Sequence, residues 1–180
     1  MTRYIAFLRA INVGGHTVKM ERLRALFEAR KLRNVETFIA SGNVIFDARS
    51  ADAALVEREI ERHLERELGY EVPTFLRTPA ELAAAAGHCP FDKRAVAGAY
   101  AVYVGFVRSP LSDDAEERVA AFRSDIHDFH VQGRELHWLS RVSVLESKVS
   151  AARLERAIGA PMTLRNVTTV RKLAARHAGV

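Results

Sequence analysis

The chain reads RYIAFLRAINVGGHT from Arg3 to Thr17, and this stretch decides much of the fold. An apolar run typical of a β-strand comes first and ends at Ile11. Gly14 and Gly15 then break the strand, just before a basic amphipathic segment that we expect to be helical. Backbone N–H groups at the start of a helix are unpaired and favour anions. The stretch therefore predicts a strand, a glycine turn and a helix whose N-terminus borders a small anion site.

The composition is that of a globular protein with a basic surface. The chain has 180 residues, 48% of them hydrophobic, and a formal net charge of +5. This length allows either one domain or two compact halves, and the apolar content is sufficient for a core. The positive charge favours partners that carry phosphate or carboxylate, although it is weak evidence for nucleic-acid binding by itself.

The cellular compartment is predicted from features that the sequence lacks. Cys89 is the only cysteine, which excludes an intrachain disulfide and favours a reducing compartment. The sequence has no segment typical of a signal peptide and no apolar run of the length that spans a membrane. We therefore expect a cytoplasmic protein with no membrane partner; the sequence does not indicate its oligomeric state.

The first half alternates strands and helices in the order β-α-β-β-α-β. Thr17 is the expected N-cap of the first helix, and Gly69 the expected end of the second. With Gly42 and Asn43 as a two-residue turn, the second and third strands form a hairpin. The expected strands are residues 4–11, 35–40, 44–46 and 72–77, and the expected helices are residues 17–32 and 51–68.

The second half repeats this order of elements, without a visible residue-level repeat. Gly133 and Arg134 form the expected turn of a second hairpin, in which His130 and His137 are cross-strand neighbours. Asn166 is expected to cap a last helix. The expected strands are residues 99–108, 128–132, 135–139 and 162–165, with helices from Ser112, over 148–158 and up to His177.

These elements predict an α+β fold with two ferredoxin-like (βαββαβ) subdomains packed side by side and a C-terminal helix. The subdomains are expected at residues 1–77 and 99–180. Residues 78–98 are expected to form a connector helix and loop, which starts with a capping box between Thr78 and Glu81.

The candidate anion site is centred on the glycine turn. Arg9 and Lys19 would supply positive charge on either side of it. Asn12 has two interpretations, because its amide can bind a ligand or hydrogen-bond its own loop. Gly14 and Gly15 are also explained by a tight turn alone, since a lone glycine pair is far weaker evidence than a full phosphate-loop pattern.

Two further stretches contribute candidates to the same site. Ser41 and Asn43 offer a hydroxyl and an amide, although a hairpin turn alone explains them. Arg165 stands at the start of a helix, where a cation is unfavourable unless it holds an anion, and Asn166 is equally well explained as an N-cap. We expect Asn12, Ser41 and Asn166 to line one concavity. The predicted ligand-binding set is Arg9, Asn12, Gly14, Gly15, Lys19, Ser41, Asn43, Arg165 and Asn166.

No constellation of residues indicates catalysis, a metal or a cofactor. His130 and His137 are only two ligands, and two ligands do not make a metal site. His88 and Cys89 are adjacent, but neighbouring residues rarely align as base and nucleophile, and no third orienting group is evident. We predict no catalytic residues, no metal and no cofactor, and the sequence leaves open whether the protein is an enzyme.

Three stretches resemble the motifs of one bacterial family. IAFLRAINVGG (Ile5–Gly15), TFIASGNVIF (Thr37–Phe46) and TLRNVTTVRKL (Thr163–Leu173) resemble those of the proteins classed as domain of unknown function 1697. Ala10 stands where that family usually has glycine, and Val167 where an aromatic residue is common, but neither change removes a polar group. The resemblance implies a cytoplasmic α+β protein of two small subdomains, and it brings no established activity.

Three functions remain open at this stage. The favoured one is binding of a phosphate-bearing small molecule or nucleotide at the loop between the first strand and the first helix. The second is an RNA-binding module, because the element order and charge fit, although the strand at 44–46 lacks the usual stacking aromatics. The third is an acylphosphatase-like hydrolase, which rests on the similar position of an anion-binding loop and lacks that family's glycine–phenylalanine–arginine pattern.

Overall fold

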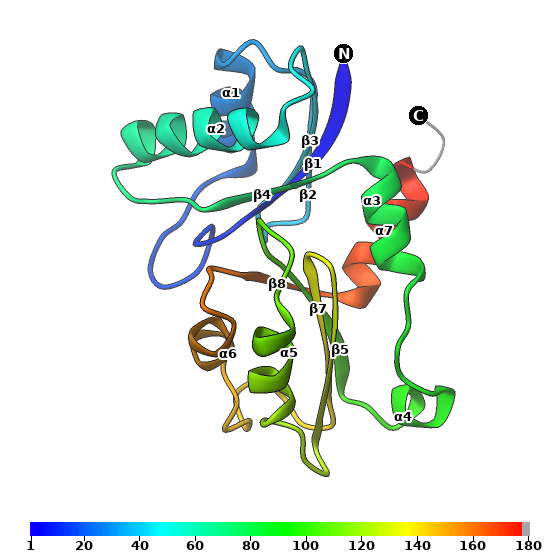
Figure 1. Cartoon of the computed structure of the whole chain (residues 1–180). Coiled ribbons are helices and arrows are strands. Elements are labelled where there is room, and N and C mark those ends of the chain that lie inside the picture. Colours follow the sequence, from blue (N-terminus) through cyan, green and yellow to red (C-terminus); the bar gives the residue numbers. More distant parts are fainter. Residues whose placement is uncertain (178–180) are drawn as a thin grey trace. The chain divides into compact units, whose positions relative to one another are not determined.

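A computed structural model describes residues 1–177 of the chain. The chain divides into two compact units, one comprising Met1–Leu82 and His177, the other Ala83–Arg176. Each unit contains one four-stranded antiparallel sheet, and residues 1–177 contain seven helices (Figure 1). The predicted α+β class is confirmed. None of the helices in this described range has both the length and the apolar character of a membrane span.

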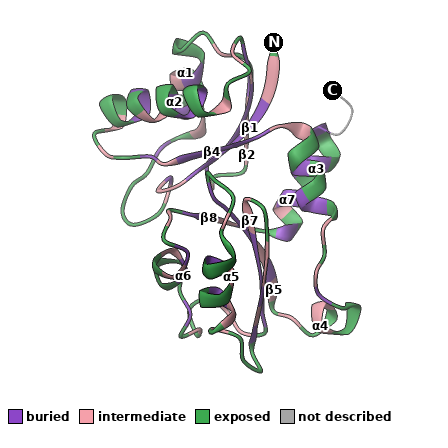
Figure 2. Cartoon of the chain, viewed as in Figure 1, coloured by how far each residue is buried: buried purple, intermediate pink, exposed green. Residues whose placement is uncertain are grey.

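The first unit has its strands in the spatial order β2-β3-β1-β4, with every neighbouring pair antiparallel. Helices α1 and α2 pack on one face, where Tyr4, Phe27 and Phe46 lie in the core. Figure 2 shows α2 with exposed residues along its outer side. The elements are β1 (Thr2–Leu8), α1 (Met20–Ala29), β2 (Arg33–Phe38), β3 (Asn43–Ala48), α2 (Ala53–Leu68) and β4 (Thr74–Arg77), followed by α3 (Pro79–Gly87).

The second unit has the strand order β6-β7-β5-β8, again antiparallel throughout. Helices α5 and α6 enclose its core with Phe129, Trp138 and Leu154. After the short α4 (Lys93–Ala97), the elements are β5 (Ala101–Phe106), α5 (Asp113–Ala120), β6 (His127–Gln132), β7 (Glu135–Ser140), α6 (Ala151–Ile158), β8 (Thr163–Asn166) and α7 (Val167–His177).

The first strands of the two units have related sequences. YIAFLR (Tyr4–Arg9) begins in β1, and YVGFVR (Tyr103–Arg108) begins in β5, which holds the equivalent place in its sheet. Their backbone contacts also agree. The amide of Leu8 donates to a carbonyl of the β2–β3 turn at 2.8 Å, and that of Val107 donates to a carbonyl of the β6–β7 turn at 3.0 Å.

The last strands of the two sheets are related in the same way. PTFLR (Pro73–Arg77) leads into and forms β4, and PMTLR (Pro161–Arg165) does so for β8. In both, the terminal arginine is buried, and its Nη1 donates to the carbonyl of the preceding leucine at 2.8 Å. A residue-level repeat therefore exists, and it becomes visible once the strands are matched by their place in the sheet.

Helix α1 begins later than predicted and spans Met20–Ala29 rather than residues 17–32. Thr17 is not its N-cap. Lys19 holds that position in an extended conformation, and no side chain caps the helix. The cause is Val18, which is buried and whose amide donates to Asn12 Oδ1 at 2.7 Å. This hydrogen bond holds Val18 in the loop, so the helix begins after it and not at Thr17.

The predicted two-residue turn of the first hairpin is wrong. Phe38 pairs with Asn43, so residues 39–42 form a four-residue turn. Asn43 is fully buried, and its Nδ2 donates to Phe38 O at 2.9 Å and to Ser41 Oγ at 3.0 Å. These bonds stabilise the wider turn, in which Gly42 adopts a φ of 76°.

The second hairpin has the predicted register. Gln132 pairs with Glu135, and His130 with His137, which leaves Gly133 and Arg134 as the turn. The predicted alternation of faces is therefore confirmed for this hairpin. In the first hairpin, by contrast, the buried Asn43 bonds across the turn and widens it.

Glutamates on the helices satisfy the amides of the outer strands. Glu57 of α2 is buried, and its Oε1 accepts the N–H of Leu76 on β4 at 2.8 Å. Glu61, one turn further along, accepts the N–H of Thr74 at 2.8 Å. In the second unit, Glu155 of α6 accepts an amide next to β8 at 2.8 Å. Because unpaired amides at a sheet edge invite pairing with other chains, these carboxylates protect the edge.

Candidate anion-binding site

The loop over residues 9–19 packs against the β2–β3 turn at residues 39–42. The contact is so close that a Cβ atom on Gly42 would lie 2.9 Å from Ile11 Cβ and 3.1 Å from Leu8 Cβ. Both neighbouring Cβ atoms are fixed to the backbone, so they cannot move aside as the end of a flexible side chain would. The absence of a side chain at Gly42 therefore allows the turn and the loop to pack this closely.

We expect Gly42→Ala to lower the free energy of unfolding by about 2 kcal/mol, because it adds a close contact to an unfavourable positive φ. Gly69→Ala is the matched control. Gly69 has a similar φ of 81°, and a Cβ atom on it would meet nothing within 4 Å, so we expect a loss of about 1 kcal/mol there. Urea denaturation of both variants measures the difference. Equal losses would show that the contact with the loop is not the cause.

Asn12 ties the loop to the turn. Its Nδ2 donates to Ala40 O at 2.8 Å, and its Oδ1 accepts the N–H of Val18 at 2.7 Å. Its φ of 55° lies in the left-handed region that asparagine tolerates. Of the two interpretations that the sequence left open, the structure supports the loop-forming one for this side chain.

Residues 13–17 are exposed and form the outer part of the loop. Gly14 and Gly15 both have positive φ, 61° and 88°, and a Cβ on either would meet nothing within 4 Å. The His16 ring stacks on Tyr70 with a centroid distance of 3.8 Å. The two glycines thus leave their backbone accessible, while the stacked ring anchors the end of the loop.

Helix α1 differs from the other described helices at its N-terminus, because no side chain caps it. Each of the remaining six begins with a side-chain oxygen that accepts a first-turn amide. These caps are Asp52, Thr78, Asp92, Ser112, Ser150 and Asn166. The uncapped first turn of α1 retains the amides and the partial positive charge that favour an anion, although Glu21 already places one carboxylate in that turn.

The two cations predicted for this site lie on either side of the loop. Arg9 is half-buried, and its amide donates to Pro73 O at 2.9 Å, which anchors the start of the loop. Lys19 is exposed at the N-cap of α1. Ser41 is half-buried in the turn, where its hydroxyl accepts from Asn43. Asn43 is therefore a structural residue of the turn, buried away from the exposed loop.

Arg165 and Asn166 belong to the second unit. Arg165 is buried, its Nη1 donates to Thr163 Oγ1 at 2.8 Å, and burial lowers its pKa to about 10. Asn166 Oδ1 accepts the N–H of Thr168 at 2.8 Å, so it caps α7 as predicted. The concavity predicted to include residues of both units stays a prediction.

A serine–histidine contact in the second unit was missed by the sequence interpretation. Ser147 Oγ lies 2.9 Å from His127 Nε2, and Trp138 Nε1 donates to His127 Nδ1 at 3.2 Å. Because Nδ1 accepts, the ring proton of the neutral histidine lies on Nε2, which donates to Ser147. Burial lowers the pKa of His127 and so favours this neutral form. In this tautomer His127 cannot take the proton of Ser147, whose hydroxyl donates to Val149 O at 2.8 Å, so the pair is structural.

His130 and His137 are cross-strand neighbours, as predicted. The ring of His88 also packs against both of them, which the sequence did not predict. Residues 1–177 nevertheless contain no group of three or more histidine, cysteine or acidic side chains arranged to hold a metal ion. Cys89 is exposed, and its thiol donates weakly to Phe91 O at 3.6 Å.

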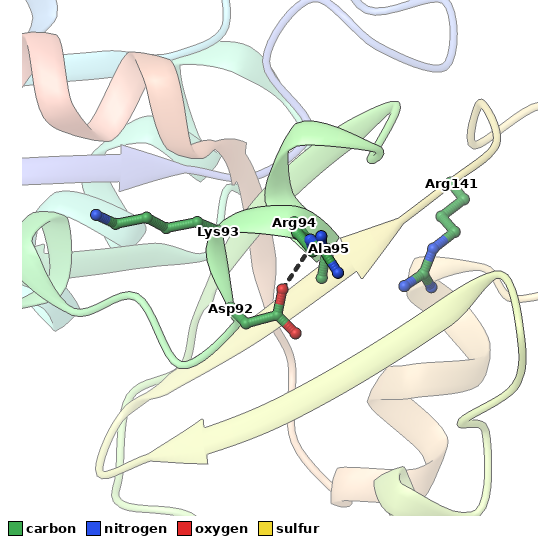
Figure 3. Close-up of a pocket in the computed structure, with 5 residues that line it drawn as sticks. All are labelled: Asp92, Lys93, Arg94, Ala95 and Arg141. Carbon is green, nitrogen blue, oxygen red and sulfur yellow. Dashed lines mark hydrogen bonds between the residues drawn. The ribbon is translucent and has the colours of Figure 1, made fainter.

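A hollow of about 560 Å³ lies in the second unit (Figure 3). It is lined by Asp92, Lys93, Arg94, Ala95 and Arg141. Asp92 Oδ1 accepts the N–H of Ala95 at 2.7 Å and caps α4. Figure 3 shows Lys93 extending away from Arg141, and the Asp92 carboxylate already places a negative charge beside the hollow. The exposed loop before α1 is therefore the better candidate for an anion site.

Comparisons with known proteins agree with the fold and identify no activity. A family model described as "Protein of unknown function (DUF1697)" matches residues 1–137. No curated protein matches the chain. Among solved structures, the conserved bacterial protein SP0830 from Streptococcus pneumoniae is similar over 99% of both chains, with 23% sequence identity and a TM-score of 0.76. This likeness shows that the two proteins share a fold.

Proposed function

Since the chain belongs to the DUF1697 family of proteins of unknown function, we propose a function from the chemistry of its first unit. The protein binds a phosphate-bearing small molecule or nucleotide at the N-terminus of α1, where Gly14, Gly15 and the first turn of the helix supply backbone amides and Lys19 a positive charge. The observation that carries this proposal is the missing side-chain cap of α1, next to two exposed glycines of positive φ. A phosphate group is the kind of ligand that such a helix start accepts.

Two observations favour this function over the alternatives. RNA-recognition sheets stack bases on exposed aromatic rings, whereas the aromatic residues of β1 and β3, namely Tyr4, Phe7 and Phe46, are all buried. An acylphosphatase-like reaction requires an asparagine free to position water, whereas both polar atoms of Asn12 bond within the protein. Binding without catalysis therefore fits the loop best.

We also infer that each unit is ferredoxin-like. The β-α-β-β-α-β order with the first strand inside the sheet is typical of that fold and supports the inference. A cytoplasmic location is our expectation from the single cysteine.

The test uses ADP as the phosphate-bearing probe and adenosine as the control without phosphate. We expect ADP, and not adenosine, to shift the NMR amide signals of Gly14 and Gly15. Lys19→Gln should weaken binding about threefold, and Glu21→Gln should strengthen it about threefold, because charges near a helix N-terminus act by about 0.3–1 kcal/mol.

The matched control is Glu28→Gln, at the opposite end of the same helix. Glu28 pairs with Arg24 at 2.8 Å and is exposed, so its loss should leave ADP binding unchanged. If ADP shifts no loop amide, or if all three variants bind it equally, the proposed site does not exist.

A further inference from the structure

Three histidine rings from separate parts of the second unit gather on one face of its sheet. His130 of β6 and His137 of β7 are paired across the hairpin. The ring of His88, which follows α3, lies 5.2 Å from that of His130 and 4.9 Å from that of His137, measured between centroids. We call these three residues the histidine cluster. It lies on the face opposite the core, because Trp138 points into the core and its neighbour His137 points the other way.

The centre of the cluster is buried and has no hydrogen-bond partner among the described protein atoms. His137 is only 1% exposed, and neither Nδ1 nor Nε2 has a partner. Nε2 of His88 also has none. A buried imidazole without partners is tolerated far better as the neutral ring than as the cation, since burial penalises charge.

The neighbouring groups do not offset this penalty. Burial, together with the smaller effects of the nearby His88 and His130, lowers the pKa of His137 to about 4. Burial and His130 also lower the pKa of His88, against a smaller opposing effect of Glu135. The strand β5 contributes uncharged Val104 opposite His137. Further charged groups on these elements are Asp128, which pairs with Arg123, and Arg165 on β8. Helix α7 carries Arg171, which reaches Ala86, and also Lys172 and Arg176.

The segment that follows His88 is attached to the rest of the second unit by few buried side chains. Between residues 88 and 100, Phe91 is the one buried residue. Helix α4 has no buried residue, as its colours in Figure 2 show. A segment with so few buried contacts opens at low free-energy cost. The contact of His88 with the two strand histidines is therefore a main attachment of this segment.

We propose that the histidine cluster is an acid-sensitive latch: it holds residues 88–97 to the β6–β7 hairpin and releases them when its rings are protonated. In the neutral state the three rings pack together. Protonation places like charges about 5 Å apart in a site without a compensating hydrogen bond, and detachment of His88 exposes the charged rings to water. A protein with such a latch exposes the surface under residues 88–97 only in acidic conditions.

The direction of the pH effect follows from the pKa of His137 in the closed and the released state. A released ring has the ordinary histidine pKa of 6.5, and the packed ring of His137 has a pKa of about 4. The contribution of this ring to closure is therefore fully present above pH 6.5 and is lost as the pH falls from 6.5 to about 4. Between pH 7 and pH 5, one such ring shifts the equilibrium toward release roughly twentyfold.

The chain itself provides the probe for this movement. Cys89 is the only cysteine, is exposed, and follows His88 directly, so a nitroxide label can be attached to the wild-type protein. We expect the electron paramagnetic resonance spectrum to gain a mobile component between pH 7 and pH 5, with the released-to-closed ratio rising roughly twentyfold. Far-UV circular dichroism at each pH should stay that of the folded protein.

Two variants and one control make the result specific. His88→Phe keeps an aromatic ring that cannot be protonated, and His137→Leu replaces the buried imidazole with an apolar side chain; either should reduce the change to less than about threefold. His16→Phe, in the first unit, should respond like the wild type. The latch does not exist if label mobility is constant with pH, if all variants respond equally, or if mobility changes only together with loss of the circular dichroism signal.

Discussion

Replacing Trp138 with alanine is expected to lower the free energy of unfolding by about 4 kcal/mol, as for other large-to-small changes in a core. Trp138 is the only tryptophan and is fully buried. Its ring stacks on Phe129 at 5.9 Å and lies 5.3 Å from Tyr103, so alanine would leave a large cavity between two aromatic rings. Urea denaturation followed by far-UV circular dichroism at pH 7 measures the loss.

Trp138→Phe separates packing from hydrogen bonding. Phenylalanine retains most of the ring contacts but cannot donate to His127, which then loses the partner of its Nδ1. We expect this variant to lose about 2 kcal/mol, for the unmade hydrogen bond and a small residual gap. Equal losses in the two variants would mean that the hydrogen bond, and not the packing, makes the tryptophan necessary.

Replacing Glu57 with alanine is expected to cost about 3 kcal/mol, because a charge-assisted hydrogen bond is lost and the amide of Leu76 stays buried without it. Glu57 is 2% exposed. Glu57→Gln keeps an oxygen acceptor and should cost only about 1 kcal/mol. Glu61→Ala removes the equivalent bond to Thr74 from a less buried position, so we expect about 1 kcal/mol there as well.

Urea denaturation of the three variants gives the order of these losses. Glu57→Ala should be clearly the least stable. If Glu57→Gln is equally destabilised, the charge and not the acceptor oxygen is what the strand edge requires. If Glu61→Ala costs as much as Glu57→Ala, burial of the carboxylate does not decide its contribution.

Sequence patterns correctly predicted those features that depend on interactions between neighbouring residues. The capping box of Thr78 and Glu81, the Ser112 cap and the end of α2 at Gly69 all depend on residues within one turn, and all three are confirmed. The second hairpin was equally predictable, because the alternation of apolar residues and the turn at Gly133 require the same register.

The predictions of the first hairpin and of the start of α1 were wrong, because these features depend on non-local contacts. Both depend on asparagine amides that bond to specific, partly distant atoms. Asn12 reaches Ala40, 28 residues away, and it also holds Val18 in the loop. Asn43 is buried and bonds back to Phe38 across the wider turn. Sequence patterns identify asparagine as a turn residue, but they do not identify the atom with which it pairs.

The candidate site was predictable in part. The exposed glycine loop and the cation at Lys19 follow from the sequence around the first strand. The absence of a cap on α1 does not, since Thr17 has the right chemistry and is displaced only by the bond to Val18. The histidine cluster was predictable only in part. The hairpin register pairs His130 with His137, whereas His88 contacts them through tertiary structure alone.

The related strands at Tyr4–Arg9 and Tyr103–Arg108 occupy equivalent places in their sheets, as a duplicated half-chain would require. The two halves differ where the first strand leads into the first helix. The first half has the long glycine loop that ends at Lys19, and the second has the short link RSPLS from Arg108 to Ser112. The proposed anion-binding loop is therefore a feature of the first half alone, because the second half has only a short link between its first strand and its helix.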